Sequence, residues 1–429
     1  MKSRLSRIRN KKGLTAVIVT AGMLCAGCGA LDKQESGFVT RQDSSVIISV
    51  LAGQSTSDAG IEDMINEVVA EKFPEIRLEW ECVDWGDAFS SQLQARLASG
   101  DVPDLIVGKA QDVAPYAKSG ALEDFSIEGS EKIEEGALEN VTIDGKMYGL
   151  PYNAWYQGVL YNKKMFSQYH LAVPETRTEL DKTVAALEKN GVIPFAAHFQ
   201  EAWSTGNMTM QFMIGDVFEK EDDWGAKFRA DKRSFTKNPV MQNCFEQNMY
   251  IKDHAFADAL MIDQYESDKR FADGEAAMYL TGAWSLQAIN QYSEDREYGI
   301  FPYPNSTGDA SLIRETNMTF MIGKNSRHKE YVCQILEELL QNQKLMQEIL
   351  DFTQTYSVVE GIQTEYESCI KDDVKRYEQE DRIVDATIGN SQLIWNFQNE
   401  IAENTFKWLN QELTLKEVLS EADKNRNNS

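Results

Sequence analysis

The sequence predicts an α/β protein of two domains, and three features indicate this class. Over residues 45–108, short β-branched runs alternate with amphipathic stretches, which is the pattern of a parallel sheet covered by helices. Residues 28–429, which remain after a predicted N-terminal signal, exceed the size of one ordinary hydrophobic core. At mid-chain the segment YGLPYNAWYQGVLYNKKMF (148–166) is rich in aromatic residues and interrupted by Gly and Pro, which suits an irregular connection better than a core helix.

The elements of residues 45–108 follow in order. SVIISVLAG (45–53) is predicted to be a strand, GIEDMINEVVAEK (60–72) a helix that ends before Pro74, and RLEWECV (77–83) a second strand. DAFSSQLQARLASG (87–100) is predicted to be a second helix and DLIVG (104–108) a third strand. The loops after these strands share one edge of the sheet, where open α/β sheets bind ligands. These loops contain Gln54-Ser55, Trp85-Gly86-Asp87 and Lys109-Ala110-Gln111.

The N-terminus predicts export. Residues 1–27 begin with six basic side chains, continue with an apolar run and end in small residues, as secretion signals do. The apolar run is shorter than the ~20 residues that a membrane-spanning helix needs, so a retained anchor helix is the lesser alternative. LCAGC followed by Gly29 resembles a bacterial lipoprotein signal, which implies that Cys28 carries the lipid, although Cys25 stands where such signals usually have Leu. Residues 28–44 are predicted to be a flexible tether that holds the body at the extracellular face of the cell membrane.

The chain is strongly acidic. Its net charge is −25, and removal of the signal takes away six positive charges and no negative one. Such a body is repelled by nucleic acid and by anionic lipid headgroups, so we expect no nucleic-acid partner. The body holds four widely spaced cysteines, Cys82, Cys244, Cys333 and Cys369. Their spacing favours free thiols over a disulfide scaffold or a zinc site, with one long-range disulfide as the alternative.

Several segments resemble, in the same order, landmarks of the extracellular solute-binding proteins of ABC importers, in the branch that contains maltose and oligosaccharide binders. These segments are ASGDVPDLIV (98–107), KSGALEDFS (118–126), the aromatic stretch 148–166, FADGEAAMYLTGAWSLQAI (271–289) and WLNQELTLKEVLSEADK (408–424). Together they span almost the whole body of the chain.

The resemblance implies a two-lobe fold of the periplasmic-binding-protein type, with lobes built from discontinuous segments and a ligand cleft between them. It implies one lobe from residues 45–152 plus about 300–350, and a second from residues 153–299 plus about 351–429. The crossovers are expected near Asn153–Gln157, near Tyr298–Pro304, and between Leu340 and Thr355. In this interpretation the aromatic stretch is both hinge and cleft wall.

Residues of two kinds are candidates for ligand contact. A sugar ring stacks its apolar face on Trp or Tyr, and its hydroxyl rim bonds to amide, carboxylate and guanidinium groups. By their place in the resemblance, the aromatic candidates are Trp85, Trp155, Trp203, Trp284, Trp395 and Tyr356, and Tyr152 and Tyr156 can also face the ligand. The polar candidates are Gln54, Asp87, Lys109, Gln111, Asn153, Glu201, Arg314 and Glu315. For Trp80, Trp224, Trp408 and Asp104 we expect ordinary structural roles.

The resemblance implies a monomeric, lipid-anchored receptor that captures a saccharide and delivers it to an ABC permease, with no catalytic residue, metal or cofactor. Two alternatives stay open: the same fold with a polyamine or other non-sugar solute, and a surface glycoside hydrolase. The sequence contains no GxSxG, HExxH, P-loop or GxGxxG motif. Its four histidines, His170, His198, His254 and His328, are scattered and are not expected near the ligand.

Overall fold

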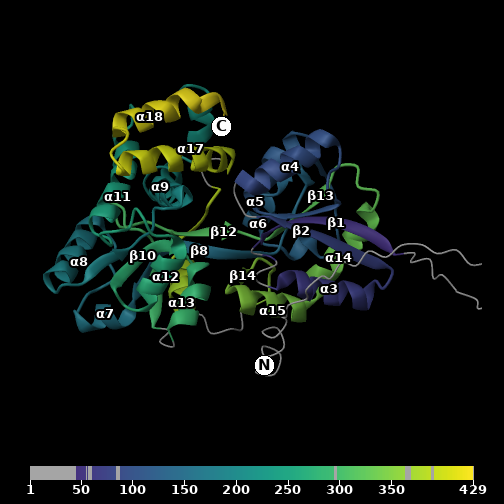
Figure 1. The fold of residues 1–429 in the computed structure, drawn as a ribbon, viewed down its shortest axis with the longest axis horizontal. Helices are drawn as coiled ribbons and strands as arrows, with labels where there is room; N and C mark the ends of the chain where they lie inside the picture. Colours follow the sequence, from purple (N-terminus) through teal and green to yellow (C-terminus); the bar gives the residue numbers. More distant parts are fainter. Residues whose placement is uncertain are drawn as a thin grey trace, which may run out of the picture. The chain divides into compact units, whose positions relative to one another are not determined.

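The computed structural model describes residues 45–54, 56, 60–83, 87–293, 297–362, 369–387 and 391–428. Residues 45–429 form one compact unit that contains two large sheets (Figure 1). The predicted signal, Cys28 and the tether lie outside the described residues. Within the described ranges, no helix is both long and apolar enough to cross a membrane.

The first sheet follows the predicted order of elements. Its strands, in spatial order, are β2 (Ile76–Val83), β1 (Val46–Gly53), β3 (Leu105–Gly108), β13 (Thr319–Gly323) and β4 (Leu122–Glu123), with β7 (Leu150–Pro151) beside β13. β1 is parallel to β2 and to β3, which confirms the parallel sheet predicted for residues 45–108. β13 enters from far along the chain and runs antiparallel to β3.

Helices cover both faces of this sheet, because successive strand residues point to opposite sides and both sides are apolar. On one face Ile48, Val50 and Val107 pack against α3 (Ile61–Lys72), α14 (Lys329–Gln341) and α15 (Gln343–Thr353). On the other face Leu51 and Ile106 pack against α4 (Asp87–Ser99) and α5 (Ala110–Lys118). The two groups of helices lie on opposite sides of β1 in Figure 1. The short elements of this region are η1 (Ser130–Lys132), α6 (Glu135–Glu139), β5 (Thr142–Ile143) and β6 (Lys146–Met147).

The second sheet is built around β8 (Asn153–Asn162). In spatial order its strands are β15 (Ile383–Asp385), β12 (Leu312–Thr316), β8, β10 (Ala276–Gly282) and β9 (Ile193–Ala196), with β11 (Tyr298–Phe301) and β14 (Tyr356–Ser357) also paired to β8. The aromatic stretch is therefore a regular strand for most of its length, rather than the irregular connection expected. Gly158 allows this, because a Cβ there would lie 2.6 Å from the carbonyl oxygen of Phe301 on β11.

Ten helices and two 3₁₀ turns of the described chain surround the second sheet. They are α7 (Lys163–Gln168), α8 (Arg177–Lys189), α9 (Ala202–Asp216), η2 (Phe218–Lys220), α10 (Trp224–Arg229), α11 (Pro239–Asp253), α12 (Gln264–Ala272), α13 (Ser285–Tyr292), α16 (Lys371–Gln379), α17 (Ser391–Leu409), α18 (Leu415–Lys424) and η3 (Asn425–Asn428). Local signals set several of their ends: Thr176 and Thr414 begin α8 and α18 with capping boxes. Asp423 in α18 accepts hydrogen bonds from the backbone N–H groups of Phe235 and Thr236, which ties the C-terminal helix to a loop far earlier in the chain.

The chain passes between the sheets after β7, after β12 and after α15. The second passage differs from the expectation near Tyr298–Pro304. Tyr298–Phe301 forms β11, a fully buried strand that completes the second sheet, and β12 follows it in the same sheet. The chain changes sheets only at residues 317–318, so the segment of the first lobe expected from about residue 300 begins later.

Asn153 joins all three passages by hydrogen bonds. Its carbonyl oxygen accepts from Asn317 N at 2.8 Å, and its side-chain Oδ1 accepts from Met318 N at 3.0 Å. Its Nδ2 donates to Thr355 Oγ1, also at 3.0 Å. The residue is fully buried. The polar groups of the Asn153 amide are thus engaged in holding the connections together, and Asn153 does not line the cavity between the sheets.

Candidate ligand cavity between the two sheets

A cavity of about 500 Å³ lies where the carboxyl ends of β1 and β3 face the second sheet, within the size range of ligand sites. Both sheets contribute to its wall. From the first sheet and its helices come Thr56, Ile61, Val107, Gly108, Lys109, Gln111, Met318 and Thr353. From the second sheet, its helices and the passage between sheets come Trp155, Gln157, Trp203, Asn207, Met210, Ile214, Gln264, Trp284, Gln287, Glu315, Asn317, Ala386 and Asn399.

Three indoles form one side of the cavity. Trp284 lies between the other two, with its ring centroid 5.6 Å from that of Trp155 and 6.5 Å from that of Trp203. Gly282 leaves room for this ring, since a Cβ there would lie 2.0 Å from it. The indole nitrogens of Trp155 and Trp284 find no acceptor among the residues that the structure describes. The indole nitrogens are themselves buried, so what these residues can offer a ligand is the apolar surface of their rings.

A row of amides continues from the indoles across the cavity floor. Gln157 lies two residues after Trp155 on β8, so the two side chains share a face of the sheet. Its Nε2 donates to Glu315 Oε2, and its Oε1 accepts from Asn207 Nδ2 at 2.9 Å. Asn207 in turn accepts from Gln211 Nε2 at 2.9 Å. The network fixes which way each amide points, which a site that reads hydroxyl groups requires.

One ion pair crosses the cavity. Lys109 Nζ, at the start of α5 on the first sheet, lies 3.8 Å from Glu315 Oε1 on β12 of the second. Asp112, just behind Lys109, accepts a hydrogen bond from the Lys109 backbone N–H at 3.1 Å. Burial raises the pKa of Asp112 to about 6. Among the described lining residues, Lys109 and Glu315 are the charged ones, and they face each other.

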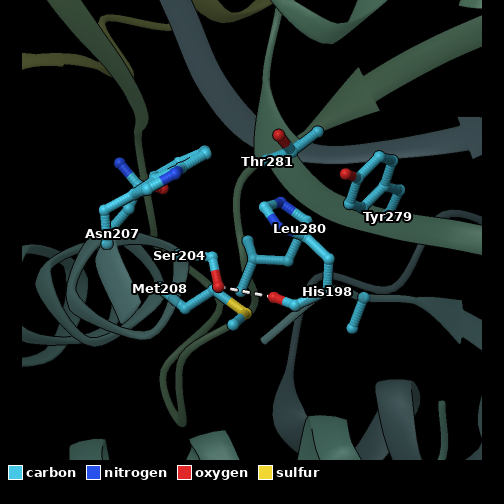
Figure 2. Close-up of a pocket in the computed structure, with 9 residues that line it drawn as sticks. His198, Ser204, Asn207, Met208, Tyr279, Leu280 and Thr281 are labelled. Atoms are coloured by element: carbon cyan, nitrogen blue, oxygen red, sulfur yellow. Dashed lines mark hydrogen bonds between the residues drawn. The ribbon is translucent and has the colours of Figure 1, made fainter. Parts of the chain in front are cut away.

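A second pocket of about 10 Å³ lies behind Trp203 and is too small for more than one water. Figure 2 shows His198, Ser204 and Tyr279 around it, with Ser204 Oγ bonded to the His198 carbonyl oxygen. The His198 ring packs edge-on against Trp203 at 5.2 Å. His198 is thus next to the cavity wall, contrary to the expectation for the histidines. It supports the indole from behind.

Six of the predicted contact residues line the cavity: Lys109, Gln111, Trp155, Trp203, Trp284 and Glu315. Trp85 lies outside the described residues, and the side chains of Asp87 and Trp395 are also outside them, although their backbones belong to α4 and α17. Gln54 follows β1 directly but is not part of the wall, which Thr56 reaches instead.

The other predicted contacts are directed elsewhere. Strand alternation turns Arg314 to the face of β12 opposite Glu315, where it pairs with Glu134 and Asp385. Tyr356 packs against the Tyr156 ring at 5.0 Å, away from the wall.

Glu201 also stays outside the wall. Its Oε2 accepts from Gln264 N at 2.9 Å and lies 3.2 Å from His198 Nδ1, an interaction that lowers the pKa of Glu201. Tyr152 is fully buried and donates from its hydroxyl to the Leu339 carbonyl, so it does not face the cavity either.

Sequence reasoning missed the amide residues of the wall, notably Gln157, Asn207, Gln264 and Gln287. Two of them carried a usable signal. Gln157 is two residues after Trp155 on a strand, and Asn207 is four residues after Trp203 on α9, so each shares a face with a candidate Trp. Gln264 and Gln287 lie on or next to helices whose position against the sheet cannot be predicted from the neighbouring sequence.

The roles expected for the structural residues agree with their contacts. Trp224 is fully buried, Trp80 donates to Asn66 Oδ1 at 3.0 Å, and Asp104 accepts from Ser49 and Ser326. Among the described residues, Cys82, Cys244, Cys333 and Cys369 are not joined by disulfide bonds. Across the described residues, no group of three or more His, Cys, Asp or Glu is arranged to hold a metal ion.

Two α/β lobes that wall one cavity and are joined by passages of the chain define a two-lobe binding protein. Residues 52–344 match the family described as bacterial extracellular solute-binding protein, and the chain belongs to this family. It is similar to the multiple sugar-binding protein of Streptococcus mutans, with 23% identity over 375 residues that cover 83% of this chain and 84% of the relative. It is also similar to the diacetylchitobiose binding protein DasA of Streptomyces coelicolor, with 27% identity over 70% of this chain and 71% of the relative.

Solved structures share the fold. The binding protein RafE in complex with raffinose superposes with a TM-score of 0.74 at 20% identity, covering 90% of this chain and 99% of that chain. A chitin oligosaccharide binding protein also gives a TM-score of 0.74 at 20% identity, covering 89% and 98%. Both likenesses show the two-lobe α/β architecture.

Proposed function

We propose that this chain is the extracellular receptor of an ABC importer and that it captures a saccharide, in particular an oligosaccharide, in the cavity between its sheets. The observation that carries the proposal is the indole wall formed by Trp155, Trp203 and Trp284 next to an oriented row of amides. Indoles stack on the apolar face of a sugar ring, and amides bond to its hydroxyl rim. The names of the relatives, which bind several sugars or diacetylchitobiose, support the same class of ligand.

Binding then follows from the arrangement of the wall. Because both sheets contribute contacts, a bound sugar touches both lobes only when they approach, and the ligand stabilises that closed form. The closed protein is the form that a membrane permease recognises, and the energy for transport comes from the importer. The chain acts as a monomeric receptor without a catalytic step.

Two alternatives have weaker support. A polyamine needs several carboxylates in its site. Among the described lining residues Glu315 is the one carboxylate, and it pairs with Lys109. Glycoside hydrolysis needs two carboxylates on either side of the scissile bond. The single carboxylate of the described wall does not favour it.

Calorimetric titration of the purified protein with raffinose, N,N′-diacetylchitobiose and spermidine tests the proposal. We expect binding of a saccharide whose affinity changes little between 50 mM and 500 mM NaCl, and no binding of spermidine. Tight spermidine binding that weakens with salt would contradict the saccharide proposal and indicate a cationic ligand. Recovery of the saccharide with a cleaved glycosidic bond would indicate that the protein is an enzyme rather than a receptor.

The anchor is a separate part of the proposal. We infer from LCAGC that Cys28 becomes the lipidated first residue of the exported chain and that the acyl chains hold the body on the outer face of the membrane. Residues 28–44 then form the tether between lipid and body.

A further inference from the structure

We propose that Asp268, a buried carboxyl one turn along α12 from the cavity wall, is a positioning residue that sets which end of the Gln264 amide faces the cavity, so that protonation of this one group changes the affinity for a saccharide. The inference rests on the proposed function in one respect, namely that the cavity between the sheets binds the saccharide. The orientation of the amide is a property of the protein without ligand.

Gln264 connects the cavity to this buried group. It lines the cavity as the first residue of α12. Asp268 lies four residues later on the same helix, so the two side chains share a face. Gln264 Nε2 donates to Asp268 Oδ2 at 3.4 Å and to Ser285 Oγ at 3.2 Å. Because these two groups hold the nitrogen end of the amide, the oxygen end is left for the cavity.

The backbone of Gln264 is held separately. Its N–H donates to Glu201 Oε2 at 2.9 Å. The same Glu201 oxygen lies 3.2 Å from His198 Nδ1, and this interaction lowers the pKa of Glu201. Glu201 thus stays ionised near neutral pH and keeps the backbone in place. The side-chain amide is then the part of Gln264 that responds when Asp268 gains or loses a proton.

Asp268 can exchange a proton near neutral pH because it is buried. Burial raises the pKa of Asp268 to about 7, and the negative charge of Glu201 acts in the same direction. Ser285, Tyr279 and Gln264 act against this rise as hydrogen-bond donors, but burial outweighs them. The carboxyl is therefore largely protonated at pH 5.5 and largely ionised at pH 8.5.

Other titratable groups face this site from the elements that pack closely against α12, which are β9, β10 and α13. β10 contributes Tyr279, whose pKa burial raises well above its usual value, and α13 contributes Tyr292, whose pKa burial and Tyr265 raise to about 12. Both tyrosines therefore stay neutral. His198, shown with Tyr279 in Figure 2, follows β9 and contacts Glu201. The other titratable residues of α12 itself are Tyr265, Glu266, Lys269 and Arg270.

The charge of Asp268 decides how the amide is held. An ionised carboxylate only accepts hydrogen bonds, so it binds the nitrogen end of Gln264 and leaves Oε1 to accept from a sugar hydroxyl. A protonated carboxyl also has an O–H to donate, and the Ser285 hydroxyl can donate or accept, so the oxygen end can then turn toward them. The neutral state divides the amide between two orientations, and a smaller fraction of molecules presents the acceptor to the ligand.

Nuclear magnetic resonance without ligand tests the amide directly, in purified protein that carries ¹⁵N-labelled glutamine and ¹³C-labelled aspartate. The side-chain NH₂ signal of Gln264, identified by its loss in Gln264→Met, should move between pH 5.5 and pH 8.5 with the same midpoint as the Asp268 carboxyl. Asp268→Asn should abolish this movement. Since imidazoles also titrate near neutral pH, His198→Asn is one control and should keep the movement. Glu266→Ala, which removes another carboxylate from α12, should keep it as well.

Three results would overturn the inference: an Asp268 carboxyl that does not titrate in this interval, a Gln264 signal that stays fixed while that carboxyl titrates, and a movement that is lost in His198→Asn but kept in Asp268→Asn. If Asp268→Asn does not fold, the two midpoints in wild type decide, because they are measured without that substitution.

Calorimetric titration with raffinose and N,N′-diacetylchitobiose gives the second measurement. The saccharide that binds wild type should bind about twofold to tenfold more weakly at pH 5.5 than at pH 8.5, the range for one hydrogen bond. Asp268→Asn should remove this dependence. Equal affinities at both pH values in wild type, or the same dependence in Asp268→Asn, contradict the effect on the ligand. If neither saccharide binds at either pH, the proposed function fails, and the ligand-free signals still decide whether Asp268 sets the amide.

Discussion

Replacing Trp284 with Ala tests the indole wall where it is most connected. The ring contacts both Trp155 and Trp203 and lines the cavity, so its removal takes away one stacking surface and loosens two others. A single aromatic contact is worth about 1–3 kcal/mol in binding, and the central position places the expected loss at about 2–3 kcal/mol. This corresponds to a dissociation constant about 30-fold to 160-fold higher.

The assay is calorimetric titration with raffinose or, if it binds better, N,N′-diacetylchitobiose, after circular dichroism has shown that the variant folds. Trp80→Ala is the matched control, since Trp80 on β2 bonds to Asn66 and does not line the cavity. Its affinity should equal that of wild type. Wild-type affinity in Trp284→Ala, or an equal loss in Trp80→Ala, would refute the assignment of the indole wall to ligand binding.

The remaining predictions concern stability and attachment. Asn153→Ala removes the acceptor of the Met318 N–H and the amide donor to Thr355 Oγ1, which keeps its bond to Thr353 Oγ1. It should lower the free energy of unfolding by about 2–3 kcal/mol in urea titration, whereas a change below about 0.5 kcal/mol would contradict the role of the amide. Cys28→Ala should abolish labelling by radioactive palmitate and move the protein from membranes to the medium; wild-type protein found in the medium with a free N-terminus would contradict the anchor. Burial raises the pKa of Asp112 from 3.8 to about 6, so its contribution to stability is complete below about pH 4 and is lost as the pH rises through 6. The melting temperature of wild type should therefore fall between pH 4 and pH 6 relative to that of Asp112→Asn. If the two proteins show parallel curves of melting temperature against pH, this contribution of Asp112 is excluded.

Local patterns predicted the first sheet well because each of its early elements lies next to the following one in space. β1, α3, β2, α4 and β3 all follow from periodicity and turn residues within residues 45–108. The same reasoning placed Lys109 and Gln111 at the cavity, since a residue after a parallel strand lies at the sheet edge.

Contacts between segments far apart in the sequence explain why some predictions failed. Arg314 and Glu315 were both candidates, yet adjacent strand residues point to opposite faces, and only pairing with β8 shows which one faces the cavity. Tyr298–Phe301 reads equally well as a passage or as a strand, and its burial against β8 decides for the strand. The hydrogen bonds of Asn153 to Met318 and Thr355 could not be predicted either, because these partners lie far along the chain.

The interleaving of the two sheets has a consequence for how the protein is made. The core of the first sheet includes Val358 and Val359, and the core of the second includes Leu419 and Ala422. The first core is complete only once residues 358–359 have been made, and the second only once residues 419–422 have been made. Contacts between such distant segments slow folding. The cavity, whose wall includes Asn399 of α17, therefore forms only after most of the chain has been made.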